Sequence, residues 1–150
     1  MESLKSVKIK GSDMHLLTLN NIVKHFPARS GIFKRGDGVV HAVDGVSFSI
    51  QKGETFGLVG ESGCGKSTLG RIIARLIEPT SGEINFDGKD ITHLKSNDLK
   101  SVRRELQIIF QDPYASLNPR MPVGEIIGEA LTIHGVAKGV EKLDKVKKLI

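Results

Sequence analysis

One glycine-rich stretch sets the fold prediction for this chain: Gly60-Glu61-Ser62-Gly63-Cys64-Gly65-Lys66-Ser67-Thr68. It fits the P-loop pattern G-x-x-x-x-G-K-[ST] without a mismatch. An apolar run at residues 55–59 precedes it and predicts a buried strand, and residues 66–77 follow with the pattern of a helix that stops before Pro79. Strand, glycine-rich loop and helix are the arrangement that the motif requires. The sequence therefore predicts that the chain binds the phosphates of a nucleotide.

The residue types of the loop suit this chemistry. Glycine at positions 60, 63 and 65 permits positive φ angles and a close approach of the backbone, so that the loop N–H groups can form a nest for an anion. The N-terminus of the following helix adds its positive end. Lys66 is expected to place a charge on the β- and γ-phosphates, and the Ser67 hydroxyl is the expected ligand of Mg²⁺. We expect nucleotide contacts along the whole loop: Gly60, Glu61, Ser62, Gly63, Cys64, Gly65, Lys66, Ser67 and Thr68.

Composition and charge narrow the class of protein. A length of 150 residues, with 39% hydrophobic and 26% charged residues, predicts one globular domain. The beginning of the chain lacks the apolar core of a signal peptide. Cys64 is the single cysteine, which excludes an internal disulfide and is compatible with a reducing cytoplasm. The net charge of +5 would suit nucleic acid, but no basic stripe interleaved with aromatic residues accompanies it, so we favour a solvated surface plus a nucleotide site.

The remaining patterns alternate between strand and helix. Strand patterns occupy residues 15–26 with an Asn-Asn break, 42–50, 83–86 and 106–110, and Asp87-Gly88 is a two-residue hairpin signal. Helical patterns occupy residues 96–105, with Ser96 as a possible cap, 123–134, closed by Gly135, and the chain from 138 onward, whereas 113–122 predicts a structured loop. Short strands joined by tight turns predict an antiparallel layer beside the phosphate-binding core.

The last helical pattern has a distinct apolar face without a stop signal. Val140, Leu143, Val146 and Ile150 lie on this face, and nothing downstream is available to cover them. We expect the chain to be a fragment of a longer protein, and we expect the isolated fragment to be marginally stable and prone to self-association.

A second segment carries a resemblance to a known family. It runs from residue 107 to 121 and reads QIIFQDPYASLNPRM; from its residues alone it is a strand that ends in a polar corner at Gln111 and Asp112. It closely resembles the Q-loop segment of ATP-binding-cassette (ABC) transporter ATPases, in particular the ATP-binding subunits of oligopeptide and dipeptide importers. Residues 41–48, 61–70 and 76–82 match the same subfamily, and the resemblance runs from about residue 15 to 135.

The resemblance implies a fold and a domain organisation. The fold would be α/β, the P-loop NTPase core of an ABC ATPase with an antiparallel β subdomain and the start of a helical subdomain, truncated. Residues 1–13 would be a polar N-terminal tail, residues 14–112 the nucleotide-binding core, and residues 113–150 an incomplete helical subdomain.

The resemblance also implies cofactors and residue roles. The cofactors would be ATP and Mg²⁺, with Lys66 and Gln111 in catalytic roles and Ser67 and Gln111 at the metal. An aromatic side chain near the end of the first strand stacks on adenine in this family. Phe26 is the best positional match, and Phe33 or His41 are alternatives.

Partners and location follow from the same resemblance. The full-length protein would be an ATPase that energises import, bound peripherally to the cytoplasmic face of the membrane. Its partners would be transmembrane permease subunits and a second ATPase subunit, identical or different, with no nucleic acid. The transported substrate stays open between oligopeptides, dipeptides and nickel.

Three family motifs do not follow Gln111 in this sequence: the LSGGQ-type signature, the Walker B strand with its acidic pair, and the switch histidine. We therefore expect this chain to bind Mg-ATP and not to hydrolyse it above background. The alternative is a complete small P-loop kinase or GTPase in which Asp112 is the Walker B acid. Gln111 interrupts that pattern.

Overall fold

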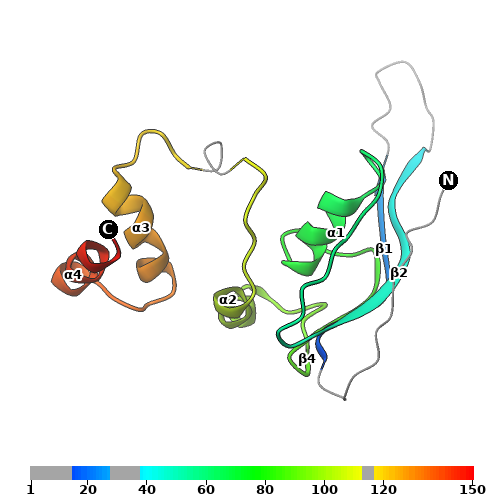
Figure 1. Ribbon diagram of the computed structural model, residues 1–150, viewed down its shortest axis with the longest axis horizontal. Coiled ribbons are helices and arrows are strands. Elements are labelled where there is room, and N and C mark those ends of the chain that lie inside the picture. Colours follow the sequence, from blue (N-terminus) through cyan, green and yellow to red (C-terminus); the bar gives the residue numbers. More distant parts are fainter. Residues whose placement is uncertain (1–14, 28–37, 113–116) are drawn as a thin grey trace. The chain divides into compact units, whose positions relative to one another are not determined.

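The computed structural model describes residues 15–27, 38–112 and 117–150 (Figure 1). The predicted tail at 1–13, Phe33 and part of the Q-loop segment lie outside these residues. The described elements are β1 (His15–Pro27), β2 (Val39–Gln51), α1 (Lys66–Ile73), β3 (Ser81–Phe86), β4 (Lys89–Asp90), α2 (Ser96–Glu105), α3 (Val123–Ile133) and α4 (Gly139–Leu149). The chain divides into two compact units, the first ending at Arg103 and the second beginning at Arg104.

The first unit contains a four-stranded antiparallel sheet in the order β2-β1-β3-β4. This confirms the predicted antiparallel layer. Leu17 and Leu19 point to the buried face of β1, two residues apart, as strand alternation requires. Asn21 then takes a φ of 50°, the pairing with β2 shifts, and Ile22 becomes fully buried. The Asn-Asn break is therefore an irregularity within one strand, which resets the side-chain alternation.

The Asp87-Gly88 turn joins β3 to β4. Asp87 has a φ of 48° and Gly88 a φ of 77°, so both central residues lie in the left-handed region that a type I′ hairpin turn requires. This confirms the hairpin that the dipeptide predicts.

Helix α1 lies beside the β1–β2 pair (Figure 1) and buries Leu69 and Ile72. The predicted end at residue 77 was wrong, because the helix ends at Ile73. Arg75 has a φ of 53°, which a helix cannot accommodate, and its buried side chain donates from Nε to the Ile91 carbonyl over 2.9 Å. The chain therefore leaves the helix to place this guanidinium inside the unit.

Two predicted strands, at residues 55–59 and 106–110, do not form. Neither segment pairs with any strand in the described part of the chain, and a strand without a neighbour has no ladder to satisfy its backbone groups. The side chains of Val59 and Ile109 are 85% and 90% exposed. Residues 55–59 are held instead through Phe56, whose ring stacks on that of Phe48 in β2 with centroids 4.6 Å apart.

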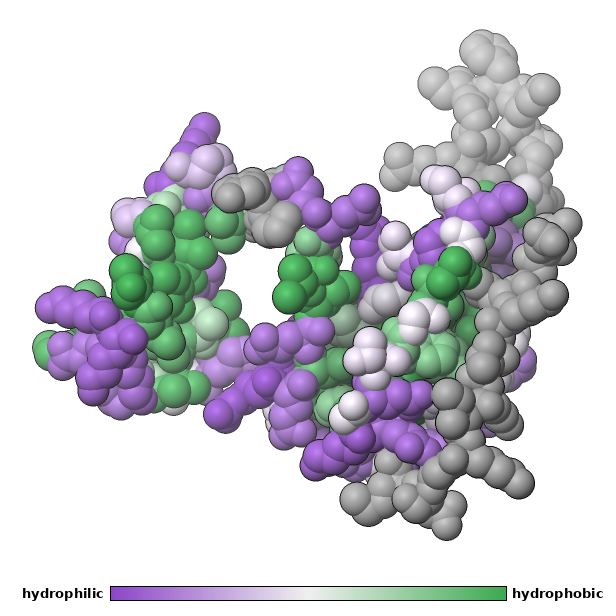
Figure 2. All heavy atoms as spheres, in the orientation of Figure 1, coloured by the Kyte–Doolittle hydropathy of each residue, from purple (hydrophilic) through white to green (hydrophobic). Residues whose placement is uncertain are grey.

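The second unit contains the pair α3 and α4. Gly128 of α3 lies against α4, where a Cβ atom would come within 3.1 Å of Lys142 Cε and 3.3 Å of Val146 Cγ2, so the missing side chain makes room for both. Val146 is buried, which corrects the prediction that it belongs to an exposed apolar face. Val140, Leu143 and Ile150 are exposed as expected, and Figure 2 shows apolar side chains gathered over these two helices. Helix α3 ends at Ile133, one residue before the predicted end at His134. Gly135 follows with a positive φ of 65°, as expected of a glycine that closes a helix.

Candidate functional site

The glycine-rich loop leads directly into α1. Gly63 and Gly65 have φ angles of 83° and 95°, so the loop uses the backbone freedom that the motif predicts. Gly65 is itself the N-cap residue of α1, no side chain caps the helix, and its first turn carries no acidic residue. The first N–H groups of α1 have no partner within the helix, and this end therefore suits an anion.

Lys66 turns its side chain back into the loop. Its Nζ donates to the Gly60 carbonyl over 2.7 Å and to the Glu61 carbonyl over 2.5 Å, and it lies 3.5 Å from Cys64 Sγ. An ammonium group has three donors, and here each has an acceptor within the loop. The structure thus brings three of the predicted residues, Gly60, Glu61 and Cys64, together around the Lys66 ammonium group. Phosphate oxygens would compete with these carbonyls for the same donors and would form stronger, charge-assisted hydrogen bonds.

Gly65 has a second reason to be glycine, which the sequence does not reveal. A Cβ atom at this position would lie 2.1 Å from the Ala42 carbonyl oxygen and 3.7 Å from Val43 Cγ2. No side chain fits there, because the loop packs directly on the backbone of β2. The sheet therefore fixes the position of the phosphate loop through backbone contact.

The hydroxyl residues of the loop differ in exposure. Ser62 and Ser67 are exposed, and Thr68 is half-buried. Ser67 lies in the first turn of α1, beside the uncapped N–H groups, and its hydroxyl can therefore bind a cation that accompanies phosphate there.

The two site residues predicted outside the loop are less closely defined. Gln111 is exposed and lies in the second unit, outside any helix or strand, so its action on the loop stays a prediction. Phe26 is half-buried at the end of β1, and Lys24 Nζ lies 5.0 Å from its ring centre. The Lys24 ammonium group therefore lies over the Phe26 ring. Stacking of Phe26 on adenine stays a prediction. His41, the alternative, stands directly opposite His25 on the neighbouring strand.

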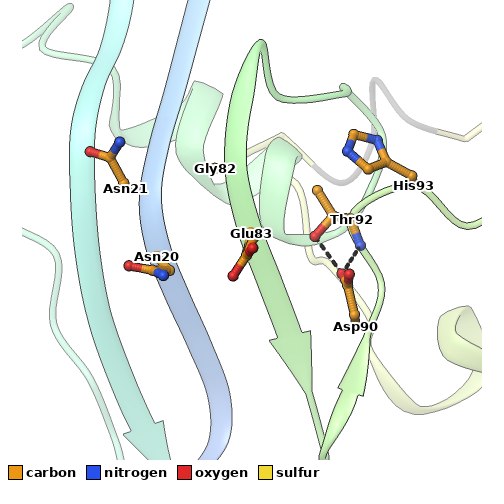
Figure 3. Close-up of a pocket in the computed structure, with 7 residues that line it drawn as sticks. All are labelled: Asn20, Asn21, Gly82, Glu83, Asp90, Thr92 and His93. Carbon is orange, nitrogen blue, oxygen red and sulfur yellow. Dashed lines mark hydrogen bonds between the residues drawn. The ribbon is translucent and has the colours of Figure 1, made fainter.

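A surface pocket of about 400 Å³ occupies another part of the first unit (Figure 3). It is lined by Asn20, Asn21, Gly82, Glu83, Asp90, Thr92 and His93. None of the predicted site residues belongs to this set. Gly82 is required for the pocket's form, because a Cβ atom there would lie 2.4 Å from the Asn21 carbonyl oxygen. The sequence gives little indication of this pocket, because only the paired asparagines, Asn20 and Asn21, mark the irregularity in the strand that lines it.

Asp90 and Thr92 form the polar edge of this pocket. Asp90 Oδ1 accepts hydrogen bonds from the Thr92 hydroxyl over 2.5 Å and from the Thr92 N–H over 2.8 Å (Figure 3). Both bonds lower the pKa of Asp90 below its usual value, and the bond from the Thr92 hydroxyl has the larger effect. Thr92 in turn accepts from the Ile84 N–H over 2.8 Å, which ties the carboxylate to β3.

Comparison with known proteins places this site in a family. Residues 43–150 match the family model described as ABC transporter. The chain is 53% identical over 136 residues to the oligopeptide transport ATP-binding protein AppF of Bacillus subtilis (strain 168), covering 90% of this chain and 41% of that protein. It is 50% identical over 135 residues to the glutathione import ATP-binding protein GsiA of Pectobacterium atrosepticum, covering 90% of this chain and 22% of that protein.

Solved structures agree in fold. The ATP-binding cassette MJ0796, solved as a dimer in a post-hydrolysis state bound to ADP and Pi, superposes with a TM-score of 0.69 at 29% identity, over 88% of this chain and 54% of that one. Within the described residues, no helix combines the length and the apolar character needed to cross a membrane. The chain spans about two fifths of the length of AppF. Because the family model covers more than half of its residues, and because the fold agrees, this chain belongs to the ABC transporter family.

Proposed function

We propose that the chain is the ATP-binding part of an importer that moves peptides across the cytoplasmic membrane, and that loop 60–68 binds the phosphates of Mg-ATP. The observation that carries the proposal is the glycine-rich loop, which closes around Lys66 and runs into the uncapped N-terminus of α1. Two similar proteins, AppF and GsiA, are named for oligopeptide transport and glutathione import. Both substrates are peptides, and we therefore favour peptides over nickel.

Different residues would bind the phosphates, the metal ion and the adenine of Mg-ATP. Loop N–H groups and the α1 N-terminus would hold the phosphates, and Lys66 would exchange its carbonyl partners for the β- and γ-phosphate oxygens. Ser67, with Gln111, would hold Mg²⁺, which neutralises charge on the phosphates when bound. Phe26 would lie against the adenine.

Partners and location extend the same proposal. We expect a second cassette, because the MJ0796 cassette is dimeric, and transmembrane permease subunits that the cassettes drive. Such a protein would work at the cytoplasmic face of the membrane. Because the chain belongs to the ABC transporter family, we set aside the alternative of a complete small kinase or GTPase with Asp112 as its Walker B acid.

Titration of a fluorescent ATP analogue with Mg²⁺ tests the proposal. Lys66→Ala should bind roughly 10- to 100-fold more weakly, because one charge-assisted contact contributes about 1.5–3 kcal/mol and each 1.4 kcal/mol is about tenfold. Lys52→Ala is the matched control: it removes an equal charge from an exposed position outside the loop and should bind as the parent does. Equal affinities for the parent and Lys66→Ala would contradict the assignment of the loop.

A further inference from the structure

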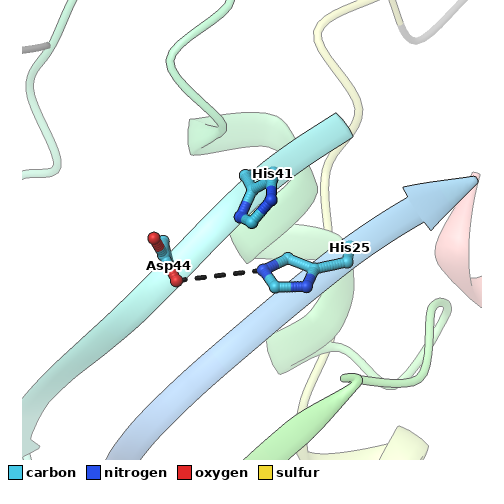
Figure 4. Close-up of side chains that lie close together, drawn as sticks. All are labelled: His25, His41 and Asp44. Carbon is cyan, nitrogen blue, oxygen red and sulfur yellow. Dashed lines mark ion pairs between the residues drawn. The ribbon is translucent and has the colours of Figure 1, made fainter. Parts of the chain in front are cut away.

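Three potential metal ligands meet on β1 and β2, apart from the phosphate loop (Figure 4). His25 comes from β1, and His41 and Asp44 come from β2. Each side chain offers one ligand atom, and the three atoms all lie within 4.8 Å of one another. Figure 4 shows the two imidazole rings and the carboxylate turned toward one another.

The pairing of the strands explains how the two histidines meet. His25 and His41 are direct partners across the antiparallel pair, and direct partners project from the same face of a sheet. Their ring centroids are 3.9 Å apart, with an angle of 51° between the ring planes.

A β-bulge explains how Asp44 joins them. In a regular strand, residues three apart point to opposite faces, so Asp44 would face away from His41. Here His25 pairs with His41 but Lys24 pairs with Val43, which leaves Ala42 as an extra residue on β2. The extra residue shifts the alternation by one and turns the Asp44 carboxylate toward the two imidazoles.

His25 Nε2 lacks a hydrogen-bond partner. The atom is buried, and no donor or acceptor in the described residues bonds to it. Asp44 Oδ1 lies 3.8 Å away, which is within ion-pair distance (Figure 4) and too far for a direct hydrogen bond. Buried ring nitrogens are normally satisfied, so an atom of this kind facing a second imidazole and a carboxylate points to a ligand between them.

We propose that His25, His41 and Asp44 form a site for a divalent transition metal, with Zn²⁺ as the representative ion. Two imidazoles and one carboxylate suit Zn²⁺ and its neighbours, whereas Mg²⁺ and Ca²⁺ prefer all-oxygen sites. Zinc bonds of about 2.0–2.2 Å place ligand atoms roughly 3.3 Å apart in a tetrahedron. His41 and Asp44 are exposed and can close the remaining distance by side-chain rotation. Water would complete the coordination.

The site is connected to the phosphate loop through Ala42. The same bulged residue that turns Asp44 toward the two histidines presents its carbonyl to Gly65, where only glycine fits. A metal bound across β1 and β2 would therefore hold the strand segment on which the loop rests.

Isothermal titration of ZnCl₂ into the 150-residue protein tests the site. We expect one saturable equivalent, and His25→Gln, His41→Gln and Asp44→Asn should each weaken it at least tenfold. His15→Gln, at the other end of β1, removes an exposed imidazole outside the cluster and should bind as the parent does. A parent protein without a saturable isotherm, or His41→Gln with parental affinity, would overturn the proposal.

Substitution with Co²⁺ identifies the ligands. Nitrogen and oxygen ligands should give visible d–d absorption without a sulfur charge-transfer band, and this absorption should disappear in the double variant H25Q/H41Q. It should persist in Cys64→Ser, because the cysteine lies in the phosphate loop. Loss of the absorption in Cys64→Ser, or its persistence in the double variant, would place the metal elsewhere and overturn the proposal. Far-ultraviolet circular dichroism of each variant checks that the sheet is retained.

Discussion

The antiparallel sheet and the segments at residues 55–59 and 106–110 have similarly apolar sequences and different structures. In β3, Ile84 is fully buried and Phe86 is 8% exposed, whereas Val59 and Ile109 are 85% and 90% exposed. The difference lies in the partners. Each strand of the sheet has a hydrogen-bonded neighbour among the described residues, and residues 55–59 and 106–110 have none. An apolar run becomes a strand only where another strand satisfies its backbone.

Truncation of one side chain in each region should give the largest difference. Ile84→Ala should destabilise the protein by about 2–5 kcal/mol, because it opens a cavity in the core of the first unit. Val59→Ala should change the stability by less than about 0.5 kcal/mol, since its side chain contributes little burial. Urea denaturation of both variants measures this. A large loss for Val59→Ala would show that residues 55–59 are packed in solution, and the contrast between the two regions would then fail.

The antiparallel part of the fold could be predicted because its signals are local. Apolar alternation marked β1 and β3, and Asp87-Gly88 marked the turn between β3 and β4. The loop could be predicted because the spacing of its glycines and Lys66 is itself the motif. By contrast, whether residues 55–59 pair depends on segments that no local pattern specifies.

Other features could not be predicted because they are tertiary. The early end of α1 depends on the buried guanidinium of Arg75 and its bond to Ile91. The bulge at Ala42, which both supports Gly65 and brings Asp44 to His25, appears only in the register of two paired strands. Bulges of this kind have no single-residue signature when the extra residue is not glycine.

Glycine-to-alanine substitutions in the loop should separate strain from packing. Gly63 and Gly65 both have positive φ, so alanine at either position should cost about 1–2 kcal/mol. Only at Gly65 would the new methyl group also collide with the Ala42 carbonyl, because no atom lies within 4 Å of a Cβ at Gly63. We therefore expect Gly65→Ala to lose more stability and more affinity for the ATP analogue than Gly63→Ala. Equal losses in the two variants would show that contact with β2 does not position the loop.

Labelling of Cys64 should report on the loop without disturbing the sheet. Its Sγ is half-buried and lies 3.5 Å from Lys66 Nζ, so a nucleotide that draws Lys66 toward phosphate changes the surroundings of the thiol. We expect Mg-ATP to slow maleimide labelling of the parent several-fold and to leave labelling of Lys66→Ala unchanged. Rapid labelling that nucleotide does not affect would place the thiol outside the nucleotide site.

The smallest expected effect concerns Asp90, at the edge of the sheet. Hydrogen bonds from Thr92 lower the pKa of this carboxyl group in the folded state below its ordinary value of 3.8. A lowered pKa stabilises the fold at pH values above the unfolded value, and this contribution is lost as the pH falls through the folded value. The free energy of unfolding should therefore fall with pH in acid less steeply for Asp90→Asn than for the parent. Thr92→Ser keeps the hydroxyl donor and the N–H donor, so it should retain the parental slope. If Asp90→Asn also retained that slope in urea denaturation between about pH 2 and pH 5, the bonds from Thr92 would not stabilise the carboxylate.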